Sequence, residues 1–167
     1  MKIVALILLV LAAAGFCPAL QADEIQPDEL TMDRVQTPNF SLTYYDDPNK
    51  TFTLNDNLGQ KNHVFVFFAT WCGACQKELP QINAIRNKYP TCDFTAINYR
   101  ETTQQVTDYF GSASIQLPCL LDKSGSVFKQ FGLEYIPDIL VVSKTGEQLM
   151  LGTKSVEELE ALLATLN

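Results

Sequence analysis

Cys72 and Cys75, which are separated by two residues, are the side chains of this sequence most suited to chemistry. A cysteine pair with this spacing at the start of a helix closes a small disulfide ring with little movement of the backbone. The second thiol is then placed to attack a mixed disulfide formed on the first, which resolves that intermediate quickly. The helix N-terminus favours the thiolate of Cys72 through its unpaired N–H groups and dipole. The pair therefore predicts two-electron thiol–disulfide exchange that needs no bound cofactor.

A structural zinc site and a structural disulfide are the two simplest alternatives for such a pair. Structural zinc normally takes four ligands, often from two Cys-x-x-Cys pairs. This sequence has one such pair, and His63 is its single histidine, so we expect no metal. A purely structural disulfide is disfavoured, because closing a ring of four residues gains little entropy.

The residues around the pair predict the elements that position it. Residues 63–69 (HVFVFFA) form a continuous apolar run, which is typical of a strand buried on both faces. The residues that follow predict a helix, since apolar side chains recur along one face at spacings of three and four. This face consists of Cys75, Leu79, Ile82, Ile85 and Tyr89. Cys75 therefore points toward the core, and Cys72 lies at the helix tip.

The rest of the chain alternates strands with helices. Alternating apolar stretches around DDPN (46–49) and SKTG (143–146) predict a hairpin near each end, and CDFTAIN and LPCLLD predict two further strands. Capping boxes at Thr102–Gln105 and Ser155–Glu158 predict helix starts. This order of elements predicts an α/β domain whose sheet is covered by helices on both faces.

The first 22 residues differ from the rest and predict a signal peptide. A charged Lys2, an apolar run over residues 3–16 and small residues up to Ala22 indicate cleavage before Asp23. The apolar run is shorter than the about 20 residues of a membrane span. The alternative is an uncleaved N-terminus that anchors the protein to the inner membrane. Export implies an oxidising compartment, here the periplasm.

Beyond the signal peptide we expect two regions. Residues 23–36 are acidic and weakly patterned, which indicates a flexible leader, and residues 37–167 form the domain. With 167 residues and 47% hydrophobic residues the chain is long enough for a real core. The net charge of −7, without a cluster of Lys or Arg, argues against a nucleic-acid partner.

Several segments together resemble the TlpA/ResA-like thioredoxin-fold proteins. FFATWCGACQKELP (67–80) is similar to their active-site segment, with Trp71 before the first cysteine and Pro80 five residues after the second. PNFSL (38–42) resembles the family's opening hairpin, LPCLLD its extra strand, and YIPDILVVSKTGEQL its proline loop and final hairpin. The resemblance covers about residues 37–166. It implies a thioredoxin fold with an N-terminal β-hairpin, an extra helix–strand insertion and a central mixed sheet.

The resemblance also implies roles for four residues near the cysteine pair. Pro137 is similar to the cis-proline that lies beside the pair in this fold, and the backbone of Ile136 would hold an incoming peptide by strand-like hydrogen bonds. Trp71 would offer client proteins an apolar contact. Glu101 resembles the glutamate that the family places near the disulfide, where it would modulate the reaction.

Four positions depart from the pattern of related proteins. Gly73 and Ala74 replace a pair that often contains proline, and Val66 stands where ordinary thioredoxin has a buried aspartate. Asp138 follows the proline at a position where threonine is common. We expect a carboxylate there to disfavour the thiolate or to repel acidic partners.

The leading hypothesis is an exported dithiol reductase that works as a monomer. It would pass electrons to oxidised protein thiols, in cytochrome c maturation first of all, and a membrane-bound donor would recharge it. The alternatives are a dithiol oxidase of exported proteins, a peroxidase, and a chaperone that binds copper through its thiols. Copper-handling relatives of this fold add a distal histidine. His63 lies before the active-site strand and is poorly placed for that role, which argues against the copper chaperone.

Cys92 and Cys119 are expected to be separate buried thiols, because cysteine is a frequent core residue. If their two strands end at the same sheet edge, Cys119 lies opposite Thr95, three residues from Cys92, at about 10 Å. A disulfide tolerates a Cα separation of only about 7 Å. A slip of two residues would bring the two cysteines within reach, so the register decides.

Overall fold

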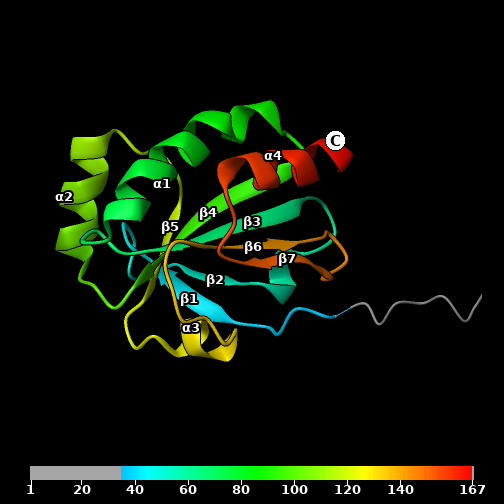
Figure 1. Ribbon diagram of the computed structural model, residues 1–167. Helices are drawn as coiled ribbons and strands as arrows, with labels where there is room; N and C mark the ends of the chain where they lie inside the picture. Colours follow the sequence, from blue (N-terminus) through cyan, green and yellow to red (C-terminus); the bar gives the residue numbers. More distant parts are fainter. Residues whose placement is uncertain (1–34, 167) are drawn as a thin grey trace, which may run out of the picture. The chain divides into compact units, whose positions relative to one another are not determined.

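Seven strands form a single mixed sheet in the computed structural model, which describes residues 35–166 (Figure 1). Across the sheet the strands follow the order β2-β1-β5-β4-β3-β6-β7. Their bounds are β1 Ser41–Tyr44, β2 Thr51–Thr53, β3 Asn62–Phe68, β4 Cys92–Tyr99, β5 Cys119–Asp122, β6 Asp138–Val142 and β7 Gln148–Gly152. The predictions for the signal peptide and for most of the leader lie outside the described residues.

Parallel strands occupy the centre of the sheet and antiparallel pairs its two sides. β4 pairs in parallel with both β3 and β5. The β1–β2 hairpin joins β5 antiparallel, and β6 joins β3 antiparallel and carries β7. The predicted mixed sheet and both predicted hairpins are therefore confirmed.

Helices cover both faces of this sheet, as predicted. Three of them, α1 (Gly73–Ile85), α2 (Thr103–Ala113) and α4 (Val156–Thr165), lie on one face, and the short α3 (Ser126–Gln130) lies on the other (Figure 1). Two 3-10 turns complete the set, η2 (Asn55–Asn57) and η3 (Arg86–Lys88). Because side chains alternate along a strand, the central strands contribute to a core layer on each face.

Local sequence explains where the helices begin and where α1 ends. Both predicted capping boxes are present, with Thr102 and Ser155 as the N-caps of α2 and α4. α1 ends at Ile85, one turn earlier than the apolar pattern suggested, and Tyr89 follows η3 as a half-buried residue. Pro90 explains this difference, since a residue that precedes proline avoids the helical conformation.

The register of β4 against β5 differs by one residue from the prediction. Cys119 is opposite Ala96 rather than Thr95, because β4 continues to Tyr99, which pairs with Asp122. Cys119 therefore lies four residues along from Cys92, or about 13 Å at about 3.3 Å per residue. Both cysteines are free and buried. The expectation of two separate thiols holds with a wider margin than the predicted register gave.

Two residues that we placed in the leader are paired with the domain. Gln36 forms a β-bridge with Glu147, and the carbonyl of Val35 accepts a hydrogen bond from the N–H of Gln148 at 2.9 Å. These contacts lie at the turn between β6 and β7. Between residues 35 and 166, none of the helices has the length and apolar character needed to span a membrane.

Candidate active site

The strand register brings three connecting segments to one edge of the sheet. β3 and β4 run in parallel with Phe68 opposite Asn98, so the residues that follow both strands lie side by side. β6 runs antiparallel to β3 with Asp138 opposite Phe67, so the residues that precede β6 reach the same edge. The cysteine pair, Glu101 and the Ile136–Pro137 segment therefore converge, although they lie far apart in the sequence.

Cys72 and Cys75 form a disulfide at the N-terminus of α1, with their Cα atoms 5.2 Å apart. Cys72 is the N-cap residue, and its Sγ accepts a hydrogen bond from the backbone N–H of Cys75 at 3.1 Å. The exposed fraction is 7% for Cys72 and 1% for Cys75. An incoming sulfur atom therefore has more access to Cys72, whose sulfur also receives the helix N–H.

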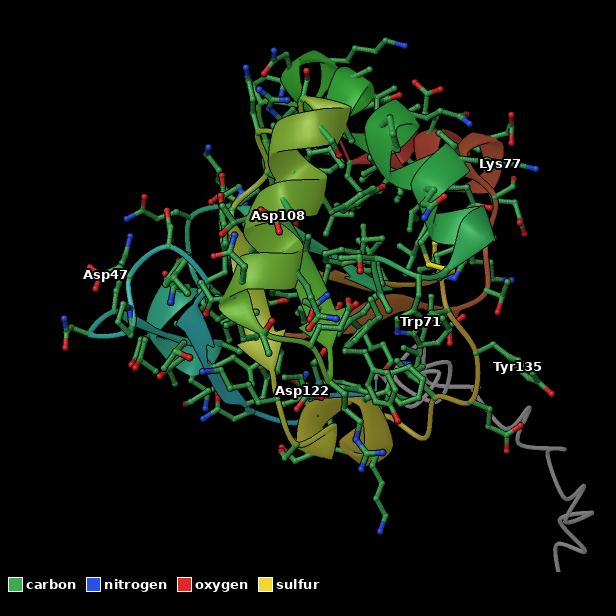
Figure 2. The ribbon with its side chains drawn as sticks, turned by 90° about the vertical axis from the view of Figure 1, so that its left-hand side faces the viewer. Asp47, Trp71, Lys77, Asp108, Asp122 and Tyr135 are labelled. Carbon is green, nitrogen blue, oxygen red and sulfur yellow. A yellow bond between two sulfur atoms is a disulfide. The ribbon has the colours of Figure 1, made fainter. Side chains whose placement is uncertain are left out.

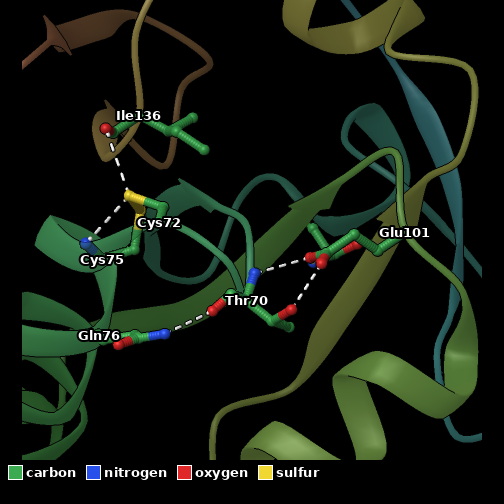
Figure 3. The surroundings of a disulfide bond; sticks show 7 residues. Thr70, Cys72, Cys75, Gln76, Glu101 and Ile136 are labelled. Carbon is green, nitrogen blue, oxygen red and sulfur yellow. Dashed lines mark hydrogen bonds between the residues drawn. A yellow bond between two sulfur atoms is a disulfide. The ribbon is translucent and has the colours of Figure 1, made fainter.

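The Ile136–Pro137 segment lies directly against Cys72. Its peptide bond is cis, as the resemblance implied. The carbonyl oxygen of Ile136 lies 3.5 Å from the Sγ of Cys72 (Figure 3). The disulfide sulfur has no proton to donate to this oxygen, whereas a reduced Cys72 thiol has one.

Glu101 is buried at this edge and is held by three donors. Its carboxylate accepts hydrogen bonds from the backbone N–H of Thr70 at 2.7 Å, from the Thr70 hydroxyl at 2.5 Å and from the amide of Asn98 at 2.6 Å. The carbonyl of Thr70 in turn accepts from the side-chain amide of Gln76 at 2.7 Å. Figure 3 shows that Glu101 points at Thr70 and not at the sulfur atoms. Its link to the cysteine pair runs through the turn that contains Thr70.

Asp138 is buried on the opposite face of the sheet from the cysteines. Its strand neighbour Phe67 and the alternate residue Leu140 belong to the core layer on the α3 side. Its Oδ1 accepts a hydrogen bond from the Thr153 hydroxyl at 2.6 Å. Burial raises the pKa of Asp138, and the bond from Thr153 partly offsets this increase. The expectation that Asp138 repels acidic partners is wrong, because its carboxyl group is not exposed to them.

Trp71 and His63 take different places relative to the pair. Trp71, the residue before Cys72, keeps 67% of its surface exposed, so it does not pack in the core. His63 is buried at the start of β3, at the other end of the strand from the cysteines. Its Nε2 lies 2.9 Å from the carbonyl oxygen of Asn57 and therefore carries the proton in this contact.

Three residues of this network were missed by the sequence analysis: Thr70, Gln76 and Asn98. One signal was available for Asn98, because it is a polar residue in the otherwise apolar second half of β4. Thr70 follows β3 just as Glu101 follows β4. Parallel pairing of β3 and β4 would therefore have placed Thr70 beside Glu101. No comparable signal was available for Gln76.

Comparison with known proteins identifies the family. Residues 33–159 match the Redoxin family. The chain belongs to this family. It is 30% identical over 132 residues to the thiol-disulfide oxidoreductase ResA of Bacillus thuringiensis subsp. konkukian (strain 97-27), a match that covers 77% of this chain and 75% of the relative. It is 27% identical over 157 residues to the sporulation thiol-disulfide oxidoreductase A of Bacillus subtilis (strain 168), with coverage of 88% and 87%.

A solved structure supports the same assignment of the fold. The thioredoxin-like protein from Aeropyrum pernix superposes with a TM-score of 0.66 at 22% identity, and the match covers 76% of this chain and 89% of that one. The thioredoxin fold and the resemblance to the TlpA/ResA-like proteins are therefore confirmed. This member of the Redoxin family is a redox enzyme of the thiol–disulfide oxidoreductase type.

Proposed function

We propose that the protein is an exported dithiol reductase of protein disulfides that reacts through Cys72 and Cys75. The observation that carries this proposal is the asymmetry of the pair. The sulfur of Cys72 accepts the helix N–H and is the more accessible one, whereas Cys75 is buried behind it. Such an arrangement suits one attacking thiol and one resolving thiol.

The reaction is a two-step exchange that starts from the reduced pair. The Cys72 thiolate attacks one sulfur of a client disulfide, which forms a mixed disulfide and releases the first client thiolate. The Cys75 thiol loses its proton and attacks the Sγ of Cys72, which releases the second client thiolate. The client disulfide gains two electrons, and the Cys72–Cys75 disulfide forms. A membrane-bound dithiol donor then reduces this disulfide by the same exchange in reverse.

Ile136 and Glu101 support these steps in different ways. We propose that the Ile136 backbone binds an extended client segment beside Cys72, since its carbonyl lies 3.5 Å from the reacting sulfur. Pro137 follows Ile136 and leads into β6 at the same sheet edge. Glu101 acts as a positioning residue, because its two bonds to Thr70 fix the turn that precedes Cys72.

A protein disulfide provides the direct test of this function. The reduced protein should cleave the disulfides of insulin when dithiothreitol is present to regenerate it, and the Cys72→Ser variant should not exceed the rate of dithiothreitol alone. Cys92→Ala is the matched control, since Cys92 is a buried cysteine at the other end of β4. Equal rates for the wild type and Cys72→Ser would overturn the proposal.

The client class is proposed from the resemblance to the TlpA/ResA-like proteins. Cytochrome c maturation requires reduced Cys-x-x-Cys-His segments for haem attachment. An oxidised peptide with this segment should therefore be reduced faster than a scrambled peptide that carries the same disulfide. Equal rates for the two peptides would be consistent with a general reductase and would exclude the Cys-x-x-Cys-His segment as a preferred client.

Export and the monomeric state complete the proposal. Lys2, the apolar run of residues 3–16 and the small residues up to Ala22 support cleavage before Asp23. N-terminal sequencing of the mature protein should therefore begin near Asp23. Retention of Met1 in the cytoplasm would contradict export, and retention in the inner membrane would indicate an anchor. Sedimentation should give the mass of one chain.

A further inference from the structure

Large apolar side chains are exposed at the active site more than elsewhere on the domain. Among residues 35–166, three such side chains are largely exposed: Val35 at 58%, Trp71 at 67% and Tyr135 at 70%. Trp71 precedes Cys72 in the sequence, and Tyr135 precedes Ile136, whose carbonyl oxygen is 3.5 Å from the Sγ of Cys72. Figure 2 shows the disulfide, Trp71 and Tyr135 on the same side of the protein. Val35 pairs with the turn between β6 and β7, at the other end of β6.

A client must lie on the surface around Cys72, on the side of the protein that carries these two aromatic residues, to react. Exchange requires sulfur–sulfur contact with Cys72, which is only 7% exposed, so the client chain has to lie directly on this surface. Polar side chains are also exposed in the same segments, since Gln76, Lys77 and Glu134 are exposed. The two rings are the large apolar side chains exposed on this contact surface. Covering them with a client side chain removes apolar area from water, which favours binding.

The spacing along an extended client strand specifies which side chain reaches the rings. Side chains of a strand alternate between its faces. When the client cysteine points at Cys72, its immediate neighbours point away, and the residues two positions before and after it point toward the protein. These residues lie about 6.6 Å from the cysteine at about 3.3 Å per residue. Such a side chain therefore points toward the surface around Cys72, to which Trp71 and Tyr135 belong as the sequence neighbours of Cys72 and Ile136.

We infer that Tyr135, together with Trp71, makes the enzyme selective for client segments with a bulky apolar side chain two residues from the reacting cysteine. The inference rests on the proposed function, because the same site must react with protein disulfides. Tyr135 is the specificity-determining residue of the pair. Its position in the loop before the cis-proline places it beside the client and not beneath the disulfide.

Three synthetic peptides test this selectivity. Each carries one cysteine as a mixed disulfide with thionitrobenzoate, a chromophore that absorbs when it is released. The first has leucine two residues before and after the cysteine, the second has leucine at the adjacent positions, and the third has serine at all four. The thiolate of Cys72 attacks the peptide sulfur, and thionitrobenzoate leaves because it is the more acidic thiol. Cys75 then releases the peptide thiol as the enzyme disulfide forms.

For the wild type we expect the first peptide to react about tenfold faster than the third, a ratio that corresponds to about 1.4 kcal/mol. The second peptide should react about as slowly as the third. Tyr135→Ala should reduce the ratio to about two, and Tyr135→Phe should keep it, because the ring and not the hydroxyl makes the contact. Val35→Ala is the matched control and should leave all three rates unchanged.

Two results would overturn the inference in different ways. A wild-type ratio near one, or a full ratio in Tyr135→Ala, would show that Tyr135 does not select clients, while the proposed function stands. No release of thionitrobenzoate from any peptide by the reduced wild type would refute the proposed function and the selectivity together. A lower reactivity of Tyr135→Ala toward all peptides, with the ratio kept, would assign Tyr135 a structural role and also overturn the inference.

Discussion

Cys72 and Cys75 differ in what reaches their sulfur atoms. The Sγ of Cys72 accepts the N–H of Cys75 and faces the carbonyl of Ile136, whereas Cys75 lies on the buried face of α1 with Leu79 and Ile82. Hydrogen bonds donated to sulfur favour the thiolate, and burial opposes it. We therefore propose separate roles for the two thiols in the exchange, Cys72 as the attacking group and Cys75 as the resolving one.

Serine variants of the two cysteines test this division of roles. Cys75→Ser should leave Cys72 able to attack but unable to be resolved, so mixed disulfides with clients should accumulate on non-reducing gels. Cys72→Ser should trap no clients, and Cys92→Ala should behave as the wild type. If both serine variants trap clients equally, the assignment of roles by helix position is wrong.

Glu101 and Thr70 should affect the cysteines in the same direction, since Glu101 contacts the active-site turn through Thr70. Glu101→Gln should change the pH dependence of alkylation at Cys72. Thr70→Val removes the hydroxyl bond to the carboxylate and should change this profile in the same sense. It should also lower the free energy of unfolding by about 1.5–3 kcal/mol, the usual loss for a hydrogen bond to a charged group.

Thr70→Ser is the matched control, because it keeps the hydroxyl and removes only a methyl group. Its alkylation profile should follow that of the wild type. If Glu101→Gln and Thr70→Val both leave the profile unchanged, then Glu101 does not modulate the reaction and serves only to hold the turn.

At the level of elements, the Asp138–Thr153 bond joins the start of β6 to the residue that follows β7. Burial raises the pKa of Asp138 in the folded protein. The folded state therefore holds the Asp138 proton more tightly than the unfolded state does. The stability contributed by this group is fully present below the unfolded pKa and is lost as the pH rises through the folded pKa.

Asp138→Asn tests this pH dependence. The variant cannot ionise at this position, so its free energy of unfolding should fall less than that of the wild type as the pH rises from about 4 to 7. Denaturant unfolding at several pH values measures the difference. Asp93→Asn is the control, because Asp93 is exposed and paired with Lys61. Parallel pH profiles for Asp138→Asn and the wild type would contradict the assignment.

The sequence predicted the strands and the helices of this domain well because their signals are local. The apolar run that became β3 and the capping boxes of α2 and α4 depend on residues within one element. The predicted register of β4 against β5 was wrong by one residue, since the register depends on where two strands that are distant in the sequence end. The prediction for Asp138 was limited in the same way. Whether its carboxyl group meets a partner depends on the face of the sheet toward which the side chain points.

The cysteine pair could be identified from its spacing in the sequence, whereas the hydrogen-bond network around Glu101 could be identified only from the structure. Thr70, Gln76 and Asn98 are ordinary polar residues in the sequence. They act together only because parallel pairing of β3 and β4 aligns the ends of both strands. Tyr135 was missed for a related reason, since its exposure next to Cys72 depends on the antiparallel pairing of β6 with β3.

For the molecule as a whole, the four cysteines between residues 35 and 166 divide into one disulfide-bonded pair and two buried thiols. Burial raises the pKa of Cys119 well above its ordinary value, which suppresses its thiolate. The oxidised mature protein should therefore show two reactive thiols in denaturant and almost none in the native state. Finding none in denaturant would mean that Cys92 and Cys119 form a second bridge.

The reduction potential of the Cys72–Cys75 pair tests the central claim most directly. The mature protein would be equilibrated with glutathione or dithiothreitol buffers of graded potential, and its reduced fraction counted by alkylation. We predict one two-electron transition, absent from Cys72→Ser, at about −250 mV or below, as suits a reductase. A transition at about −120 mV would contradict the proposed direction and indicate an oxidase. A pair that does not exchange with either buffer would contradict the redox role itself.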